Sequence, residues 1–243
     1  MPYSMIFAMK NLSHYSLITA NLLLFGFLTG AAKAQTINFS VPEKVQHGSS
    51  YAYSGLGAAP DASTNTVWNQ FVLGGTTANN LASDGSVTAV TATLGAASIA
   101  SHGSLSAPFD EPADLFGTYT YSADSGTLNN VSAGTYDLYL YGVNANYLDG
   151  RTYDFTAGTD LTESTTQETS VNTSDTAFIL GQNYVEFVDL QVGAGGQVDF
   201  SIAGLSGSEA DFNGLQLQAV PEPTTLALAG LGIAGFVAAR RRK

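Results

Sequence analysis

The sequence predicts an all-β protein: an antiparallel β-sandwich of jelly-roll type, flanked by a signal helix at the N-terminus and a transmembrane helix at the C-terminus. Three observations predict the sandwich. About ten short runs rich in β-branched and aromatic residues alternate polar and apolar positions. Clusters of Gly, Asn, Asp and Ser, such as "SDGS", "NNVSAG" and "GAGG", separate these runs. Between the two ends, the sequence lacks helical periodicity and the strand–helix alternation of a parallel sheet.

The alternation is clearest in two runs of the second half. In "GQVDFSIAG", Val198, Phe200 and Ile202 fall on one face of a strand, and in "GTYDLYLYG" Leu138 and Leu140 share a face. We expect these apolar faces to line the core of the sandwich. In chain order, the expected strands cover Ile37–Val41, Thr66–Leu73, Ser86–Leu94, Gly117–Ser122, Thr135–Val143, Thr152–Thr156, Ala177–Leu180, Tyr184–Val192, Gln197–Ala203 and Phe212–Val220.

Two stretches depart from this alternation. Residues 161–174 ("LTESTTQETSVNTS") are polar and rich in Thr and Ser, which predicts either an exposed loop or an edge strand. Residues 96–114 have the composition of a loop-like insertion that carries the acidic run "DEPAD". Because no tandem repeat and no linker divides the chain, the sequence predicts one domain between its two ends.

The chain closes with "VPEPTTLALAGLGIAGFVAARRRK", residues 220–243. Thr224–Ala239 carries no charge, and as a helix it would span about 24 Å, less than the ~30 Å hydrocarbon core of a bilayer. Four basic residues follow at once: Arg240, Arg241, Arg242 and Lys243. This order predicts a stop-transfer segment whose C-terminus stays in the cytoplasm. A buried core helix that ends in cations is the alternative.

The N-terminus has the three parts of a secretory signal peptide. Lys10 gives a weakly positive start, Leu17–Leu28 is an apolar core, and Ala32-Lys33-Ala34 is a small-x-small cleavage site. We expect export through the Sec translocon and cleavage between Ala34 and Gln35. An uncleaved membrane helix is the alternative, which the shortness of the apolar run disfavours.

Pro221, Glu222 and Pro223, the apolar helix and the terminal basic cluster together resemble the PEP-CTERM sorting signal of Gram-negative bacteria. The resemblance covers residues 220–243 alone. It implies recognition by an exosortase, processing near the Pro-Glu-Pro motif, and transient anchoring in the inner membrane through the C-terminal helix. It also implies delivery to the cell surface or the extracellular matrix. The expected organisation is a signal peptide at 1–34, the β-sandwich at 35–219 and the sorting signal at 220–243.

Charge separates the expected mature chain from several classes of protein. Between residues 35 and 220, Lys44 and Arg151 stand against 19 acidic residues, a formal charge of −17. This balance argues against nucleic acid and anionic lipid as partners, and it favours divalent cations and neutral glycans. The chain has no Cys, so the sequence predicts no disulfide, no thiol chemistry and no Cys-based zinc site.

The sequence shows no catalytic constellation, and we predict a protein that is not an enzyme. The two histidines of the expected mature chain, His47 and His102, have the surroundings of solvated loop residues. No Gly-x-Ser-x-Gly turn presents a nucleophilic serine. Asp110, Glu111 and Asp114 form the densest acidic cluster, for which a solvated loop is a simpler interpretation than the carboxylate pair of a glycosidase.

Three segments, "YSGLGAAPDASTNTVWNQF", "AGTYDLYLYGVNA" and "SEADFNGLQL", resemble the galactose-binding-like β-sandwiches used as carbohydrate-binding modules. Such modules often hold a structural calcium beside their first and last strands, which the resemblance carries to Asp211 and Asn213, with Glu209 as an outer candidate. An acidic turn that bonds its own backbone is the alternative. Tyr139 and Tyr141, on a half-exposed strand face, are candidates for glycan contact or for cross-strand pairing alone.

These features lead to three hypotheses of function. The first is an exported, exosortase-sorted surface or matrix protein whose non-catalytic sandwich associates with extracellular polysaccharide. The second is a lectin-like, carbohydrate-binding module with a structural calcium, the only cofactor that the sequence suggests. The third and least favoured is a hydrolase of matrix glycans. We expect Trp68, the single tryptophan, to lie in the core and not on a sugar-binding platform.

Overall fold

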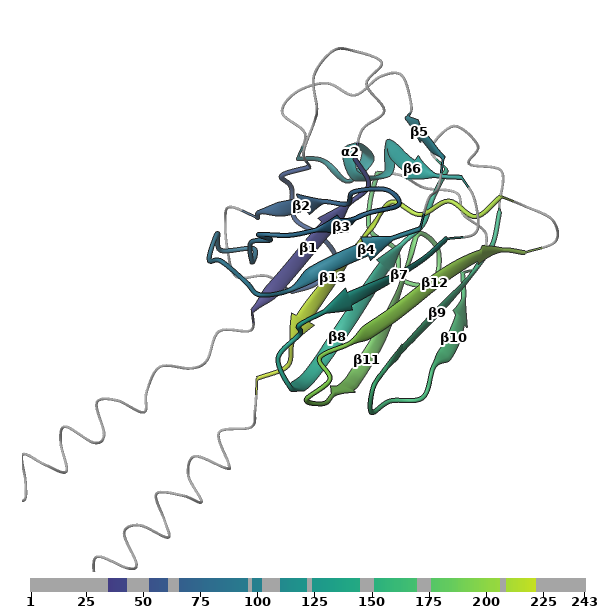
Figure 1. The fold of residues 1–243 in the computed structure, drawn as a ribbon. Helices are drawn as coiled ribbons and strands as arrows, with labels where there is room; N and C mark the ends of the chain where they lie inside the picture. The colour runs from purple at the N-terminus through teal and green to yellow at the C-terminus, as the bar shows by residue number, and fades with distance from the viewer. Residues whose placement is uncertain are drawn as a thin grey trace, which may run out of the picture. The chain divides into compact units, whose positions relative to one another are not determined.

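Strand pairing in the computed structural model divides the chain into two sheets that lie face to face as two layers (Figure 1). The structure describes residues 35–42, 53–60, 66–95, 98–101, 110–121, 124–144, 151–169, 176–205 and 209–221. The first sheet has five strands in the order β11-β8-β13-β1-β2. Its strands are β1 (Thr36–Ser40), β2 (Trp68–Gln70), β8 (Gly134–Tyr141), β11 (Tyr184–Val192) and β13 (Gly214–Ala219).

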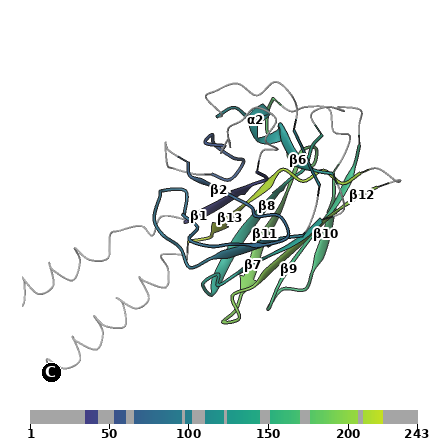
Figure 2. The ribbon, with the colours of Figure 1, turned by 45° about the horizontal axis from the view of Figure 1, so that its top comes forward.

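The second sheet has six strands in the order β10-β9-β12-β7-β4-β3. Its strands are β3 (Thr76–Thr77), β4 (Thr91–Leu94), β7 (Asp124–Asn129), β9 (Tyr153–Thr159), β10 (Thr165–Glu168) and β12 (Val198–Gly204). A short third sheet pairs β5 (Ile99–Ser101) with β6 (Thr118–Thr120), and the one-turn helix α2 (Pro112–Phe116) precedes β6 at one end of the sandwich (Figures 1 and 2).

Neighbouring strands pair in the antiparallel direction, with the exception of β1 and β2, which run parallel. The described chain is therefore nearly all β, and the prediction of an antiparallel β-sandwich is confirmed. The order in which a jelly roll winds its strands stays a prediction.

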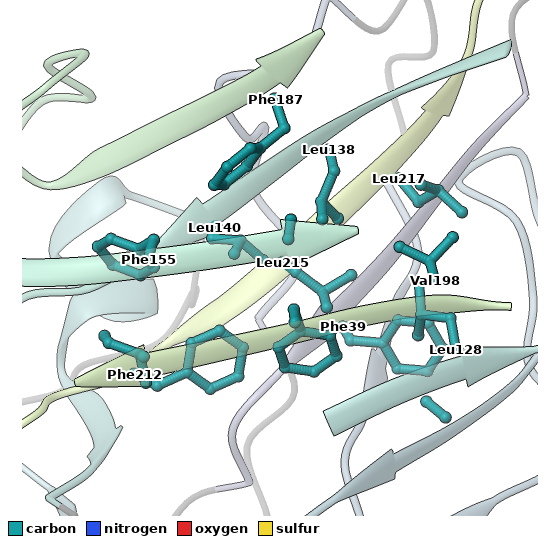
Figure 3. Close-up of a cluster of buried hydrophobic side chains, with 14 of the residues drawn as sticks. Phe39, Leu128, Leu138, Leu140, Phe155, Phe187, Val198, Phe212, Leu215 and Leu217 are labelled. Carbon is teal, nitrogen blue, oxygen red and sulfur yellow. The ribbon is translucent and has the colours of Figure 1, made fainter. Parts of the chain in front are cut away.

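The core lies between the two sheets, and period-two alternation builds it. Leu138 and Leu140 of β8 point into it from the five-stranded sheet, and Val198 of β12 points into it from the other (Figure 3). Phe200 of β12 is buried in the same cluster. The ring of Phe200 stacks on Phe212 with a centroid separation of 5.5 Å. Each fully buried side chain of this size stabilises the fold by roughly 1.5–3 kcal/mol. The faces predicted from the two alternating runs are confirmed.

Strand β7, in the middle of the six-stranded sheet, is a strand that the sequence does not predict. Gly126 lies opposite Phe200, and a Cβ at this position would collide with the Phe200 ring and with the Thr93 carbonyl oxygen. The glycine therefore gives the Phe200 ring room to lie across β7. Gly126 also explains why the sequence does not predict this strand, because "DSGTLN" has the composition of a turn.

A second, mainly aromatic cluster covers the outer face of the five-stranded sheet. Trp68 of β2 and Tyr141 of β8 pack there with Phe116 of α2 and with residues 53–60, and these rings are buried. The indole N–H of Trp68 donates to the Gly55 carbonyl oxygen at 2.9 Å. The expectation that Trp68 lies in the core is confirmed, and protein covers the part of this outer face that Trp68 and Tyr141 form.

Several sequence expectations differ from the observed elements. Strand β10 is an end strand of its sheet, so the edge-strand alternative for residues 161–174 is correct. Residues 96–114, expected as a loop, contribute β5 and the start of α2. Ala177–Leu180, expected as a strand, forms only a bridge between Leu180 and Tyr184. Strands β3 and β5 are unpredicted because two or three residues are too few to show a period.

The expected targeting segments lie outside the described residues. At the N-terminus these are the signal peptide and Ala34 of its cleavage site. At the C-terminus they are residues 222–243, which include Glu222 and Pro223 of the sorting motif and the basic cluster. Gln35 directly precedes β1, and Pro221 is the last described residue. Within the described ranges, no helix is long and apolar enough to cross a membrane. The transmembrane helix at 224–239 stays a prediction.

Candidate functional site

The outer face of the six-stranded sheet carries a groove of about 670 Å³. Its lining comes from β3, β4, β7, β9 and β12, together with the turn before β3 and the segment before β10. Of its 14 lining residues, seven are Ser or Thr and four are Gly. Small polar side chains therefore dominate the floor, and the ring of Phe200 contributes from the buried side of the sheet.

Strand register aligns the hydroxyl side chains in two rows across the sheet. The first row runs through Thr76, Thr93, Thr127 and Asp199. The second row runs through Ser125, Ser201, Thr156 and Thr166. Residues that pair across strands share a face, and neighbouring strands lie about 4.8 Å apart, so each row offers a polar group on each of the four strands that it crosses.

Asp199 ends the first row, on β12, and is the only charged residue among the described residues that line the groove. Its carboxylate is exposed and held from two sides. The Thr127 hydroxyl donates to Oδ1 at 2.8 Å, and the Gln197 side-chain amide donates to Oδ1 and Oδ2 at 2.9 and 2.8 Å. These bonds orient the carboxylate in the floor of the groove, while its outer side remains exposed.

Sequence reasoning does not single out these groove residues. The signal is present in the outward positions of three strands, where Thr91 and Thr93, Ser125 and Thr127, and Asp199 and Ser201 alternate with residues that face the core. A search for period-two hydroxyl residues would find the individual pairs. Their assembly into rows depends on β7 lying between β4 and β12, which the chain order does not indicate.

Asp211, one of the three residues expected at a calcium site, is completely buried. Its carboxylate accepts a hydrogen bond from the Tyr153 hydroxyl at 2.6 Å and one from the Asn144 amide at 3.3 Å. Arg151 Nη1 lies 3.5 Å from Asp211 Oδ2 and 3.5 Å from Glu209 Oε2. Burial raises the pKa of Asp211 to about 6, although the Tyr153 hydroxyl and the Arg151 guanidinium oppose this shift.

Asn213, the second expected calcium ligand, joins three backbone segments. Its side-chain oxygen accepts from Val143 N–H at 2.6 Å, and its amide donates to the carbonyl oxygens of Phe116 and Thr118 at 3.1 and 2.9 Å. Asn213 is fully buried, so this side chain fastens α2 and β6 to the five-stranded sheet.

The arrangement of these three residues does not fit a calcium ion. A calcium ion takes six to eight oxygen ligands, but here the oxygen of Asn213 is bonded to backbone and the guanidinium of Arg151 supplies the positive charge beside Asp211 and Glu209. Across the described residues, no group of three or more His, Cys, Asp or Glu side chains is arranged to hold a metal ion.

Tyr139 and Tyr141 do not lie on a half-exposed face, and that expectation is wrong. Their exposed fractions are 4% and 0%. The Tyr141 hydroxyl accepts from Ala58 N–H at 2.7 Å and donates to the Gln216 side-chain oxygen. The reason is the layer of residues 53–60 and α2, which covers these rings and which strand periodicity cannot reveal.

The acidic cluster before β6 belongs to a helix end. Glu111 is the N-cap of α2, and its backbone N–H donates to Asp114 Oδ2 at 3.1 Å. Carboxylates in the first turn stabilise a helix because they accept from free backbone N–H groups and oppose the helix dipole. Asp114 thus has a structural role. His47 and His102 lie outside the described residues.

The comparisons with known proteins identify the tail of the chain. Residues 219–243 match the model of the PEP-CTERM protein-sorting motif. The chain therefore carries the signal of an exported protein that an exosortase processes and that is sorted to the cell surface after transient anchoring in a membrane. A comparison with curated proteins finds no match.

Two solved structures are similar to parts of the sandwich. TmCBM61, in complex with β-1,4-galactotriose, is similar with a TM-score of 0.24 and 12% identity, covering 44% of this chain and 72% of its own. The exo-β-1,3-galactanase of Phanerochaete chrysosporium, with β-1,3-galactotriose, has a TM-score of 0.32 and 18% identity over 54% of this chain and 30% of its own. TM-scores this low establish neither the fold nor a ligand of this chain.

Proposed function

We propose that the sandwich is a non-catalytic module that associates with extracellular polysaccharide through the groove on its six-stranded sheet. The observation that carries the proposal is the pair of hydroxyl rows, which together cross the strands that line the groove. The PEP-CTERM motif supports the proposal, because it directs the protein to the cell surface, where an extracellular polysaccharide would be within reach. The host in this proposal is a Gram-negative bacterium.

The chemistry of the rows suits a polyhydroxylated chain. Ser and Thr hydroxyls each offer one donor and two acceptor positions, as sugar hydroxyls do, so the two surfaces can exchange hydrogen bonds. A repeating set of polar groups along the floor also suits a polymer better than a single small molecule. No exposed aromatic ring is among the lining residues that the structure describes. We therefore expect little stacking and weak binding, with a Kd on the order of 1 mM per site.

Hydrolysis of the bound glycan is not part of the proposal. Glycoside hydrolysis commonly needs two carboxyl groups on either side of the bond that is cleaved. Among the described lining residues, Asp199 is the only carboxylate. The groove therefore has the polar surface of a binding site without the acid–base pair of a hydrolase.

Ser201, at the middle of the second row, offers a direct test. Its side chain points to the outer face, so Ser201→Leu fills the groove without disturbing the core. Ala203→Leu is a matched control, because Ala203 lies on the same strand and face but outside the lining. We expect Ser201→Leu to abolish retardation of the exported protein in native gels that contain the host's purified extracellular polysaccharide, and Ala203→Leu to retain it. Equal retardation of both variants, or none for the unaltered protein, would contradict the proposal.

A further inference from the structure

We infer that the groove recognises a cationic glycan, one whose sugars carry protonated amino groups. This inference rests on the proposed function and names the ligand class of the same site. It starts from the direction of the hydrogen bonds in the first hydroxyl row, which decides what a ligand has to supply there.

The hydroxyl protons of Thr127 and Thr93 are already used in hydrogen bonds within the protein. Thr127 Oγ1 donates to Asp199 Oδ1 at 2.8 Å, and Thr93 Oγ1 donates to the Thr127 carbonyl oxygen at 3.3 Å. Each hydroxyl therefore presents only lone pairs to the groove. Thr127 on β7 lies between Thr93 on β4 and Asp199 on β12, so this part of the floor is a run of acceptors, and a ligand there must donate.

An ammonium group matches this requirement better than a sugar hydroxyl. An ammonium carries three donors and no acceptor, whereas a sugar hydroxyl also presents lone pairs, for which the Thr127 and Thr93 hydroxyls have no donor left. A hydrogen bond from a charged donor to a carboxylate is also stronger than a bond between neutral groups. A glycan that bears free amines would thus satisfy Asp199 and its neighbours together.

The charge of Asp199 is not balanced by the protein. Arg151 is the only Lys or Arg within the described ranges, and its guanidinium lies between Asp211 and Glu209. The same outer face also carries two adjacent negative charges, because Glu168 of β10 pairs directly across from Asp154 of β9. Like charges opposite each other destabilise a strand pair, and a positively charged chain that extends along this face would relieve that repulsion.

The net negative charge of the chain also favours a positively charged ligand. The chain between residues 35 and 220 holds two cations and 19 acidic residues. Such a charge repels an acidic polysaccharide and raises the local concentration of a basic one. A general attraction of this kind does not depend on the groove, so the test has to separate it from recognition by Asp199.

The test compares two oligosaccharides that differ only in N-acetylation. Chitosan tetrasaccharide carries free amines, and N-acetylated chitotetraose has the same backbone without charge. We would titrate both into the exported protein in slightly acidic buffer and measure binding by calorimetry or NMR. The expected result is an affinity for the amine form about three- to fivefold higher, the size expected of one ion pair at an exposed site.

Two variants with the same net charge localise the effect. Asp199→Asn should remove most of the preference for the amine form and leave only the part that the overall charge contributes. Asp189→Asn should keep the preference, because Asp189 is exposed on β11 in the other sheet, and its positive φ of 56° suits Asn. Loss of the preference in both variants, or in neither, would overturn the inference in favour of general charge attraction.

Failure of the inference and failure of the proposed function give different results. If both oligosaccharides bind with equal affinity and Ser201→Leu abolishes both, the groove binds glycans without selecting amines, and only the inference fails. If neither oligosaccharide binds and the host polysaccharide does not retard the protein, both fail. Tighter binding of the N-acetylated form would also overturn the inference.

Discussion

The substitution Asp211→Asn should remove a component of stability that depends on pH. Asp211 is fully buried, and burial raises the pKa of its carboxyl group from 3.8 to about 6. An amide at this position does not titrate, but its oxygen can still accept the hydrogen bond that the Tyr153 hydroxyl donates. The difference between the unfolding profiles of the two proteins therefore isolates the titration of this one group.

The sign and size follow from the linkage between proton binding and folding. A carboxyl group whose pKa is higher in the folded state than in the unfolded state holds its proton more tightly when folded, so it stabilises the fold at low pH. A shift from 3.8 to about 6 corresponds to about 3 kcal/mol. This stability is fully present below the unfolded pKa of 3.8 and is lost as the pH rises through about 6.

Urea unfolding from about pH 4 to about pH 7 measures this effect. The free energy of unfolding of the unaltered protein, minus that of Asp211→Asn, should fall by about 2–3 kcal/mol over this range. Asp124, whose pKa burial also raises, titrates in both proteins and cancels in the difference. A flat difference curve would refute the argument. A curve that rises with pH would show that Arg151 outweighs burial and holds the pKa of Asp211 below its ordinary value.

Two further predictions concern the closing segment of the sandwich and the tail. Asn213→Ala should lower the free energy of unfolding by about 3–5 kcal/mol, because it leaves three buried backbone groups without their partner. A loss below about 1 kcal/mol, or a calcium-dependent rise in the unaltered protein's unfolding midpoint that the substitution abolishes, would contradict this structural role. Replacing Pro221, Glu222 and Pro223 by alanines should block processing, so that intact-mass analysis of the cell-associated protein finds Arg240–Lys243 retained. Unchanged processing would mean that the cleavage machinery reads another part of the tail.

The sequence by itself determined the features that depend on local pattern. Alternation in "GQVDFSIAG" identified the core face of β12, since a strand places every second side chain on the same side. The order of motif, apolar run and basic cluster identified the sorting tail. Both signals are contained in short windows of the chain, and neither depends on which strands become neighbours.

The tertiary structure decided what each polar or aromatic residue does. Tyr153 and Asp211 are 58 positions apart and meet in one buried cluster, so a residue that suggested a calcium ligand is instead the partner of Arg151. Tyr139 and Tyr141 have the spacing of an outward face, yet residues 53–60 and α2 bury them. Long-range packing is not encoded in local periodicity.

The groove illustrates the same limit most directly. Its hydroxyl residues sit on separate strands, and each short run looks like an ordinary solvated face. They form a site because β7, a strand with the composition of a turn, pairs between β4 and β12 and places Thr127 beside Asp199. Strand order in a sheet is set by the burial of the opposite face, where Gly126 makes room for Phe200. The candidate binding surface therefore depends on how the core packs.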